Sequence, residues 1–237
     1  MVIPMLRALC ALMTVTLFST NIALASKIRD NGPHAFLSIP LTVSHNPYQI
    51  AWRRVSAGSG ISTSVSNEAR MLNGLSKLHL VNQWVNSSIT YEDDAENWSA
   101  NDYWATAEQT LNKRAGDCED IAILKMQILR AAGVPASTMY MTIGSDLAAE
   151  RAHAVLVVRN NGQFWVLDST TDTIQMSDGY IDFRPIFSLG ATATWLHGYA
   201  LASASAPPTE ALKRPHRLAR LAEGHKLAAV IAAQKQR

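Results

Sequence analysis

The chain has 237 residues, of which 48% are hydrophobic and 17% charged, enough for one globular domain with a hydrophobic core. After residue 25 no stretch is long and apolar enough to span a bilayer, which excludes a multi-span membrane protein. The formal net charge of +2 is unevenly divided, because residues 26–202 carry a net charge of −4 and residues 203–237 a net charge of +5. No nucleic-acid partner is expected for the acidic main segment.

The first 25 residues have the features of a secretory signal peptide. Arg7 precedes an apolar run from Ala8 to Phe18, and Ala23-Leu24-Ala25 matches a small-x-small cleavage site before Ser26. We therefore predict that residues 1–25 are a signal peptide and that the protein is periplasmic.

Three stretches precede the most informative part of the chain. Residues 26–65 are rich in Pro, Gly and Ser, which predicts an irregular segment with one short strand, Ile39 to Val43. Apolar residues at helical spacing predict an amphipathic helix over residues 67–86. Residues 92–104 are acidic and aromatic, and they form either a solvated loop or one wall of a cleft beside the cysteine that follows.

A helix is predicted to begin at Cys118. Asp117 is a suitable N-cap, and the stretch from Ala131 to Pro135 contains the Gly and Pro that end helices. Backbone N–H groups in the first turn have no partner inside the helix, and the positive end of the dipole favours a thiolate. One position could therefore supply both a nucleophile and an oxyanion donor.

Cys118 is the only cysteine left once the signal peptide, with Cys10, is removed. A single thiol in an oxidising compartment needs a reason to exist, and the alternative to a nucleophile is a small buried apolar residue. The carboxylates of Asp117, Glu119 and Asp120 would raise the pKa of the thiol. This conflict predicts a bound cation or a basic partner close by.

A β-hairpin is predicted after the cysteine helix. Strands are expected over residues 138–143, 152–159 and 163–168, with a connector over residues 144–151 and a turn at Asn160-Asn161-Gly162. If the loop centres on Asn160-Asn161, His153 lies opposite Asp168, and a shift of one or two residues leaves the pair on a diagonal within reach. A carboxylate so placed can orient an imidazole. Considered alone, His153 could be a structural histidine and Asp168 a turn residue at the end of a strand.

The end of the chain differs in composition from the rest. One or two closing strands are predicted over residues 172–200. Residues 203–237 form a basic C-terminal tail, helical or disordered, that could touch an anionic membrane. The globular domain is accordingly predicted to span residues 26–202.

The chain resembles the bacterial transglutaminase-like cysteine proteinases, the family of LapG-like periplasmic proteases, over roughly residues 45–198. The motifs that carry the resemblance are Asp102-Tyr103-Trp104-Ala105-Thr106, Gly116-Asp117-Cys118-Glu119-Asp120, Leu129-Arg130-Ala131-Ala132-Gly133-Val134-Pro135, Ala152-His153-Ala154-Val155-Leu156, Val166-Leu167-Asp168, and Pro185-Ile186-Phe187-Ser188-Leu189 followed by Trp195.

The resemblance implies an α+β fold with a papain-like, transglutaminase-like core, in which the cysteine helix packs on an antiparallel sheet bearing His and Asp. It implies that Cys118 is the nucleophile, His153 the general base and acid, and Asp168 the orienting carboxylate. It also implies a Ca²⁺ ion bound by Asp117, Glu119 and Asp120, whose oxygen ligands suit this hard cation.

The family further implies an endopeptidase that cuts a large surface adhesin, with a role in biofilm formation, under the control of an inner-membrane cyclic-di-GMP receptor. Two alternatives remain open from the residues alone. A transglutaminase-type acyl transferase would use the same triad, and a non-catalytic binding module could keep the same fold.

Overall fold

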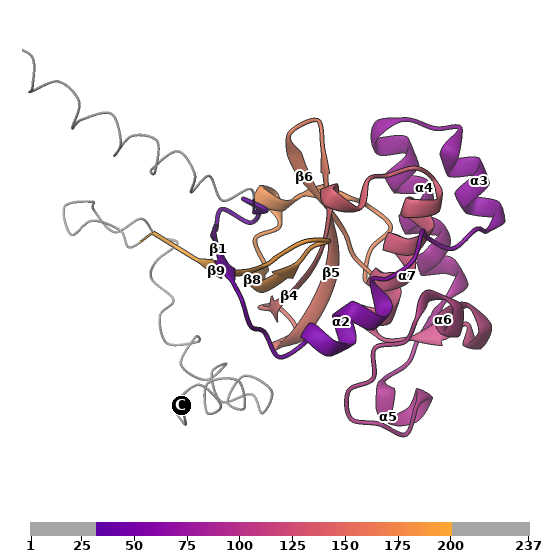
Figure 1. Cartoon of the computed structure of the whole chain (residues 1–237), viewed down its shortest axis with the longest axis horizontal. Coiled ribbons are helices and arrows are strands. Elements are labelled where there is room, and N and C mark those ends of the chain that lie inside the picture. Colours follow the sequence, from indigo (N-terminus) through magenta and orange to yellow (C-terminus); the bar gives the residue numbers. More distant parts are fainter. Residues whose placement is uncertain (1–31, 201–237) are drawn as a thin grey trace, which may run out of the picture. The chain divides into compact units, whose positions relative to one another are not determined.

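The computed structural model describes residues 32–200, and these form a seven-stranded sheet with helices packed beside it (Figure 1). The predicted signal peptide (1–25) and basic tail (203–237) lie outside the described residues. Within residues 32–200 no helix has the length and apolar character needed to cross a bilayer.

The sheet is antiparallel throughout, in the order β1-β9-β8-β4-β5-β6-β7. Its strands are β1 (Ile39–Val43), β4 (Met139–Asp146), β5 (Arg151–Asn160), β6 (Gln163–Leu167), β7 (Gln175–Met176), β8 (Phe183–Leu189) and β9 (Thr194–Gly198). A separate parallel pair joins β2 (Thr90–Tyr91) and β3 (Ala115–Gly116). The predicted α+β class is confirmed.

The α-helices lie between β1 and β4 in sequence, and two short 3-10 turns follow them. They are α2 (Gln49–Val55), α3 (Ser64–Arg70), α4 (Gly74–Ser88), α5 (Asp94–Asn97), α6 (Ala107–Lys113) and α7 (Cys118–Ala131), with 3-10 turns η1 (Ala136–Thr138) and η2 (Ser177–Gly179). The helix that begins at Cys118 is confirmed, and it ends within one residue of the predicted stop signal.

The single helix predicted over residues 67–86 is wrong, because the structure has two helices there. α3 begins earlier, at a capping box made by Thr63 and Ser66, and ends at Arg70. α4 begins at Gly74, whose φ of +54° breaks the helical path. Met71, one of the apolar residues on which the prediction of a single helix rests, lies in the break and is 82% exposed.

Helix α7 is buried on every side rather than along one face. Each residue from Cys118 to Leu129 is buried, because α7 packs against β4 and β5 as well as against α3, α4 and α6. The carbonyl groups at its C-terminal end accept hydrogen bonds from cations. Arg70 donates to the carbonyl of Ala131 (2.5 Å), and Lys77 donates to that of Ala132 (2.8 Å). Positive charge at this end stabilises the helix dipole.

The N-terminal segment is more ordered than its composition indicates. The predicted strand Ile39–Val43 is confirmed and forms an edge of the sheet beside β9. Helix α2 was not predicted. Its Trp52 is buried and donates an indole hydrogen bond to the carbonyl of Gly190 (3.0 Å), so α2 is part of the core.

The β5–β6 hairpin turns one residue later than predicted. Asn160 pairs with Gln163, so Asn161 and Gly162 form the two-residue loop. Both have positive φ values, 51° and 80°, as a type I′ turn requires. The resulting register differs by two residues from the predicted one. The preceding connector is also shorter than predicted, because β4 continues to Asp146 and β5 begins at Arg151.

Gly144, on β4, allows β8 to approach β4 closely next to the cleft described below. It pairs with His153 on β5 and with Pro185 on β8, and the register with β8 shifts between Ile143 and Gly144. A Cβ atom at Gly144 would lie 2.3 Å from the carbonyl oxygen of Arg184, which is backbone and cannot move aside.

We therefore expect Gly144→Ala to lower the free energy of unfolding by about 1–3 kcal/mol, because the added methyl group overpacks the strands. Urea denaturation measures this change. Gly179→Ala is the matched control, since a Cβ atom there meets no atom within 4 Å. Equal stability of the two variants would contradict this account.

Candidate active site

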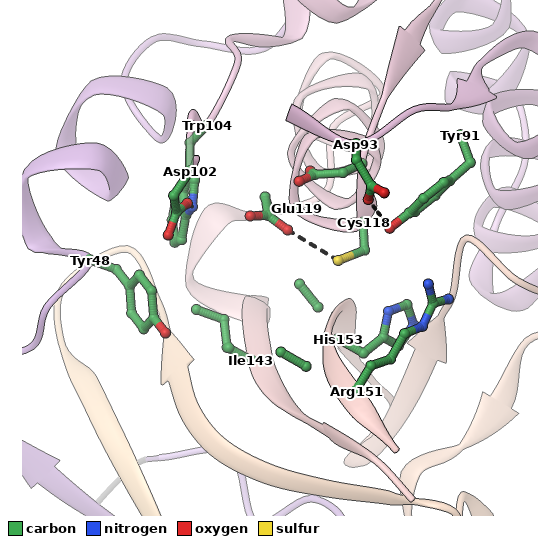
Figure 2. A pocket seen from close by; sticks show the side chains of 13 residues that line it. Tyr48, Tyr91, Asp93, Asp102, Trp104, Cys118, Glu119, Ile143, Arg151 and His153 are labelled. Carbon is green, nitrogen blue, oxygen red and sulfur yellow. Dashed lines mark hydrogen bonds between the residues drawn. The ribbon is translucent and has the colours of Figure 1, made fainter. Parts of the chain in front are cut away.

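A cleft of about 300 Å³ opens at the N-terminal end of α7 (Figure 2). One wall comes from the acidic and aromatic segment predicted over residues 92–104, and the opposite wall from β4 and β5. The lining residues are Tyr48, Tyr91, Asp93, Asp102, Trp104, Asp117, Cys118, Glu119, Ile143, Arg151, Ala152, His153 and Ala154. Of the two interpretations of residues 92–104, the structure supports the cleft wall.

Cys118 lies at the start of α7, as predicted. Asp117 caps the helix by accepting a hydrogen bond from the backbone N–H of Asp120 (3.3 Å). The thiol is 8% exposed and donates a hydrogen bond to a Glu119 oxygen (3.1 Å), toward which it points in Figure 2. Burial, followed by the charges of Glu119 and Asp117, raises the pKa of the thiol well above its usual range. Without a counter-charge, the sulfur therefore keeps its proton.

His153 and Asp168 meet as predicted, with Nε2 of the imidazole 2.8 Å from Oδ1 of the carboxylate. The observed register pairs Leu156 with Leu167 and ends there, so Asp168 reaches His153 from just beyond the last pair. Both side chains are buried. Because Nε2 is engaged by Asp168, Nδ1 is the ring nitrogen left for the thiol. β5 packs against α7, and the backbone N–H of Ala154 lowers the pKa of Cys118 slightly against the larger effects that raise it.

The carboxylate of Asp168 accepts further hydrogen bonds. The backbone N–H of Thr170 donates to Oδ1 (2.9 Å), and the hydroxyl of Tyr180 donates to Oδ2. Burial alone would raise the pKa of Asp168, but the hydrogen bonds and the charge of His153 hold it below its usual range. Asp168 therefore remains a carboxylate that can hold the imidazole in one orientation. Tyr180 was not predicted, since no spacing in the sequence relates it to Asp168.

Three buried carboxylates gather beside the thiol. Oxygen atoms of Asp94, Asp117 and Glu119 all lie within 4.8 Å of one another, a grouping that could hold a metal ion. Asp117 and Glu119 were predicted as ligands, whereas Asp94 was not. Asp120 lies outside this group, and its Oδ1 accepts a hydrogen bond from the N–H of Ala105 (2.6 Å). Its Oδ2 is buried and accepts no hydrogen bond.

The electrostatics of these carboxylates fit a cation. Burial and then the charge of Glu119 raise the pKa of Asp117 to about 9. Burial likewise raises the pKa of Asp120 to about 7. Carboxylate oxygens are the ligands that Ca²⁺ prefers, and a bound cation would offset this repulsion. The residues present therefore fit calcium.

The far end of the cleft is aromatic and apolar. The ring of Tyr48 stacks on Trp104 with centroids 5.2 Å apart, and Ile143 lines the same region. The opposite end carries the guanidinium of Arg151, which lies 5.6 Å from the centre of the Tyr91 ring. The cleft therefore has an aromatic, apolar end and a positively charged end.

A family model described as bacterial transglutaminase-like cysteine proteinase matches residues 54–183. This match covers more than half of the chain, and the chain belongs to that family. The fold and the cleft agree with this assignment, and the protein is a cysteine peptidase. No curated protein matches the chain.

Solved structures of Legionella pneumophila LapG are similar to this chain. One is 29% identical, covers 56% of this chain and 74% of its own, and has a TM-score of 0.50. A calcium-bound form is 28% identical over 60% of this chain and 80% of its own, with a TM-score of 0.52. An EGTA-treated form is 27% identical over 66% and 82%, with a TM-score of 0.51.

We expect Glu119→Gln to increase the reactivity of Cys118 in calcium-free solution. The substitution removes a negative charge that raises the pKa of the thiol. A fall of one pKa unit would make alkylation by iodoacetamide about tenfold faster below the pKa. The measurement is the alkylation rate against pH in EGTA. Glu108→Gln, at an exposed position on α6, is the control. An unchanged alkylation rate in Glu119→Gln would show that the charge of Glu119 does not raise the pKa of Cys118.

Proposed function

We propose that the protein is a periplasmic, calcium-dependent cysteine endopeptidase that uses a Cys118-His153-Asp168 triad. The observation that carries the proposal is the 2.8 Å contact between His153 and Asp168 on the wall of the cleft that holds the Cys118 thiol. A lone buried thiol at a helix start, a histidine and an orienting carboxylate are the groups that thiol-based peptide hydrolysis needs.

The chemistry follows from the placement of these side chains. Nδ1 of His153 takes the proton from Cys118, and the sulfur attacks the carbonyl carbon of a peptide bond. The N–H of Cys118, in the first turn of α7, donates to the developing oxyanion. His153 then gives its proton to the leaving amine, and a thioester to Cys118 remains. A water molecule deprotonated by His153 hydrolyses this thioester and restores the thiol.

Asp117, Glu119 and Asp94 would hold the calcium ion. Asp120, the third ligand predicted from the sequence, lies outside this group and contributes its negative charge nearby. When bound, calcium supplies the positive charge that offsets the carboxylates keeping the proton on Cys118. The calcium-bound and EGTA-treated forms of Legionella pneumophila LapG support a calcium site in this family.

The wider setting of the proposal rests on the resemblance to LapG-like proteases. Residues 1–25 would direct export, and the substrate would be a large cell-surface adhesin whose release affects biofilm formation. An inner-membrane cyclic-di-GMP receptor would control access to the protease, and the basic tail (203–237) would touch the membrane.

Calcium is expected to stabilise the protein more at high pH than at low pH. The pKa of Asp117 rises from 3.8 to about 9 on folding, so the calcium-free folded state binds more protons than the unfolded state between these values. Stability without calcium therefore falls as pH rises through this window. We expect the increase in Tm on adding Ca²⁺ to be larger at pH 8 than at pH 5.

Asp117→Asn tests the same carboxylates, because Asn keeps the helix cap while removing the charge. This variant should be more stable than the wild type in EGTA at pH 8 and should lose the gain from calcium. Glu96→Gln, exposed on α5, is the control. Identical melting of the wild type in Ca²⁺ and in EGTA would overturn the calcium assignment.

The substrate can be sought by comparing cells that carry wild-type protein with cells that carry Cys118→Ala. We expect a large surface protein to be released, with a new N-terminus, only when Cys118 is present. N-terminal proteomics of the culture medium is the measurement. Incorporation of dansyl-cadaverine into proteins, without new termini, would instead establish acyl transfer and overturn the peptidase proposal.

A further inference from the structure

A lysine is completely buried in the middle of the catalytic helix. Lys125 has 0% exposure and lies on α7, seven residues after Cys118 and therefore on the same face two turns later. Among residues 32–200 the structure shows no salt bridge to its ammonium group. Burying an unpaired lysine costs free energy, so its retention calls for a reason beyond packing.

The ammonium group of Lys125 has one hydrogen-bond acceptor, the main-chain carbonyl of Asp168, at 2.9 Å. The side-chain amide of Asn86, on α4, donates to the same carbonyl at 3.0 Å. The residue that orients His153 is thus held at its backbone by donors from two helices, while its carboxylate accepts hydrogen bonds from His153, Thr170 and Tyr180.

The chain that follows Asp168 is anchored in the same way. Asn86 also donates to the carbonyl of Thr171 (3.0 Å). Asn82, fully buried one turn earlier on α4, donates to the carbonyls of Thr171 (2.9 Å) and Asp172 (3.1 Å). Residues 168–172, which we call the aspartate loop, therefore have no regular structure of their own but are fixed to α4 and α7 by side-chain amides and one amine.

We propose that Lys125 is a positioning residue of the triad, which ties the helix that carries Cys118 to the backbone of Asp168. The nucleophile and the carboxylate come from different layers, α7 and the end of β6. The Lys125–Asp168 hydrogen bond joins these layers directly, so it sets where the aspartate loop lies relative to the helix. The inference rests on the catalytic roles proposed above for the three residues.

The chemistry of lysine suits this role. The pairing of β5 with β6 ends at Leu167, so the carbonyl of Asp168 has no hydrogen-bond partner within the sheet. Only a long side chain can reach this carbonyl from α7. A charged donor makes a stronger hydrogen bond than a neutral one. Burial lowers the pKa of Lys125 to about 7, while the charges of Asp168 and Asp172 raise it. These carboxylates therefore favour the ammonium form that the contact uses.

Lys125→Met separates positioning from packing, because methionine fills a similar apolar volume but cannot donate. We expect this variant to melt at or above the wild-type temperature, since a buried amine that makes no salt bridge is removed. The NMR resonance of the His153 Nε2 proton, which reports the hydrogen bond to Asp168, should shift or broaden. Alkylation of Cys118 by iodoacetamide, measured with calcium present, should slow by about tenfold or more, since small misplacements in an active site have effects of this size.

Leu124→Ala is the matched control, since Leu124 is the neighbouring residue of α7 and is also fully buried. It should lower the Tm but leave the His153 resonance and the alkylation rate unchanged below its melting range. If Lys125→Met does not fold, Lys125→Gln takes its place, because its amide is too short to reach the carbonyl.

An unaltered His153 resonance in the Lys125 variant, or a rate loss that only follows the loss of stability as in Leu124→Ala, would overturn the proposal. The NMR readout needs no substrate. Failure of this inference is therefore distinguishable from failure of the peptidase proposal. The peptidase proposal fails if alkylation of Cys118 in the wild type does not require His153.

Discussion

Burial of the first turn of α7 is the constraint on which the site depends. It places a thiol and several carboxylates together in a volume of low dielectric, where unlike charges attract strongly and like charges repel strongly. The thiol donates a hydrogen bond to Glu119, and in this protonated form it is not the thiolate that acts as a nucleophile. A cation would offset the repulsion among these carboxylates, which is the basis of the calcium site proposed above.

The sheet contributes His153 and Asp168 to the site through a β-hairpin. A tight hairpin brings β5 and β6 together, and Asp168 follows the last paired residue of β6. Beyond that point no ladder of hydrogen bonds defines the path of the chain. Side chains from α4 and α7 define it instead, so the geometry of the carboxylate depends on the packing of helices against the sheet as well as on strand pairing.

Much of this arrangement could be predicted from local sequence signals. The start of α7 follows from Asp117 and the first-turn carboxylates, and its end from Gly133 and Pro135. The Asn-Gly pair indicated the hairpin, although the register was wrong by two residues because the positive φ values fall on Asn161 and Gly162 rather than on Asn160 and Asn161. A diagonal contact tolerates this error, which is why the His153–Asp168 pair was still found.

What could not be predicted depends on contacts between distant segments. Asp94 joins Asp117 and Glu119 because α5 packs against β3, the strand that directly precedes α7. Tyr180 and Lys125 reach Asp168 from 12 and 43 residues away in sequence. Helix α2 was missed because its burial, through Trp52, depends on a contact with the carbonyl of Gly190, in the distant connection between β8 and β9.

The origin of Tyr48 has a consequence for how this kind of enzyme diversifies. Tyr48 lies at the aromatic end of the cleft, yet it precedes residues 54–183, which the family model matches. Cys118, His153 and Asp168 lie within the matched stretch, whereas this side chain of the cleft wall lies before it. Substitutions before residue 54 can alter which peptides fit while every reacting group keeps its place.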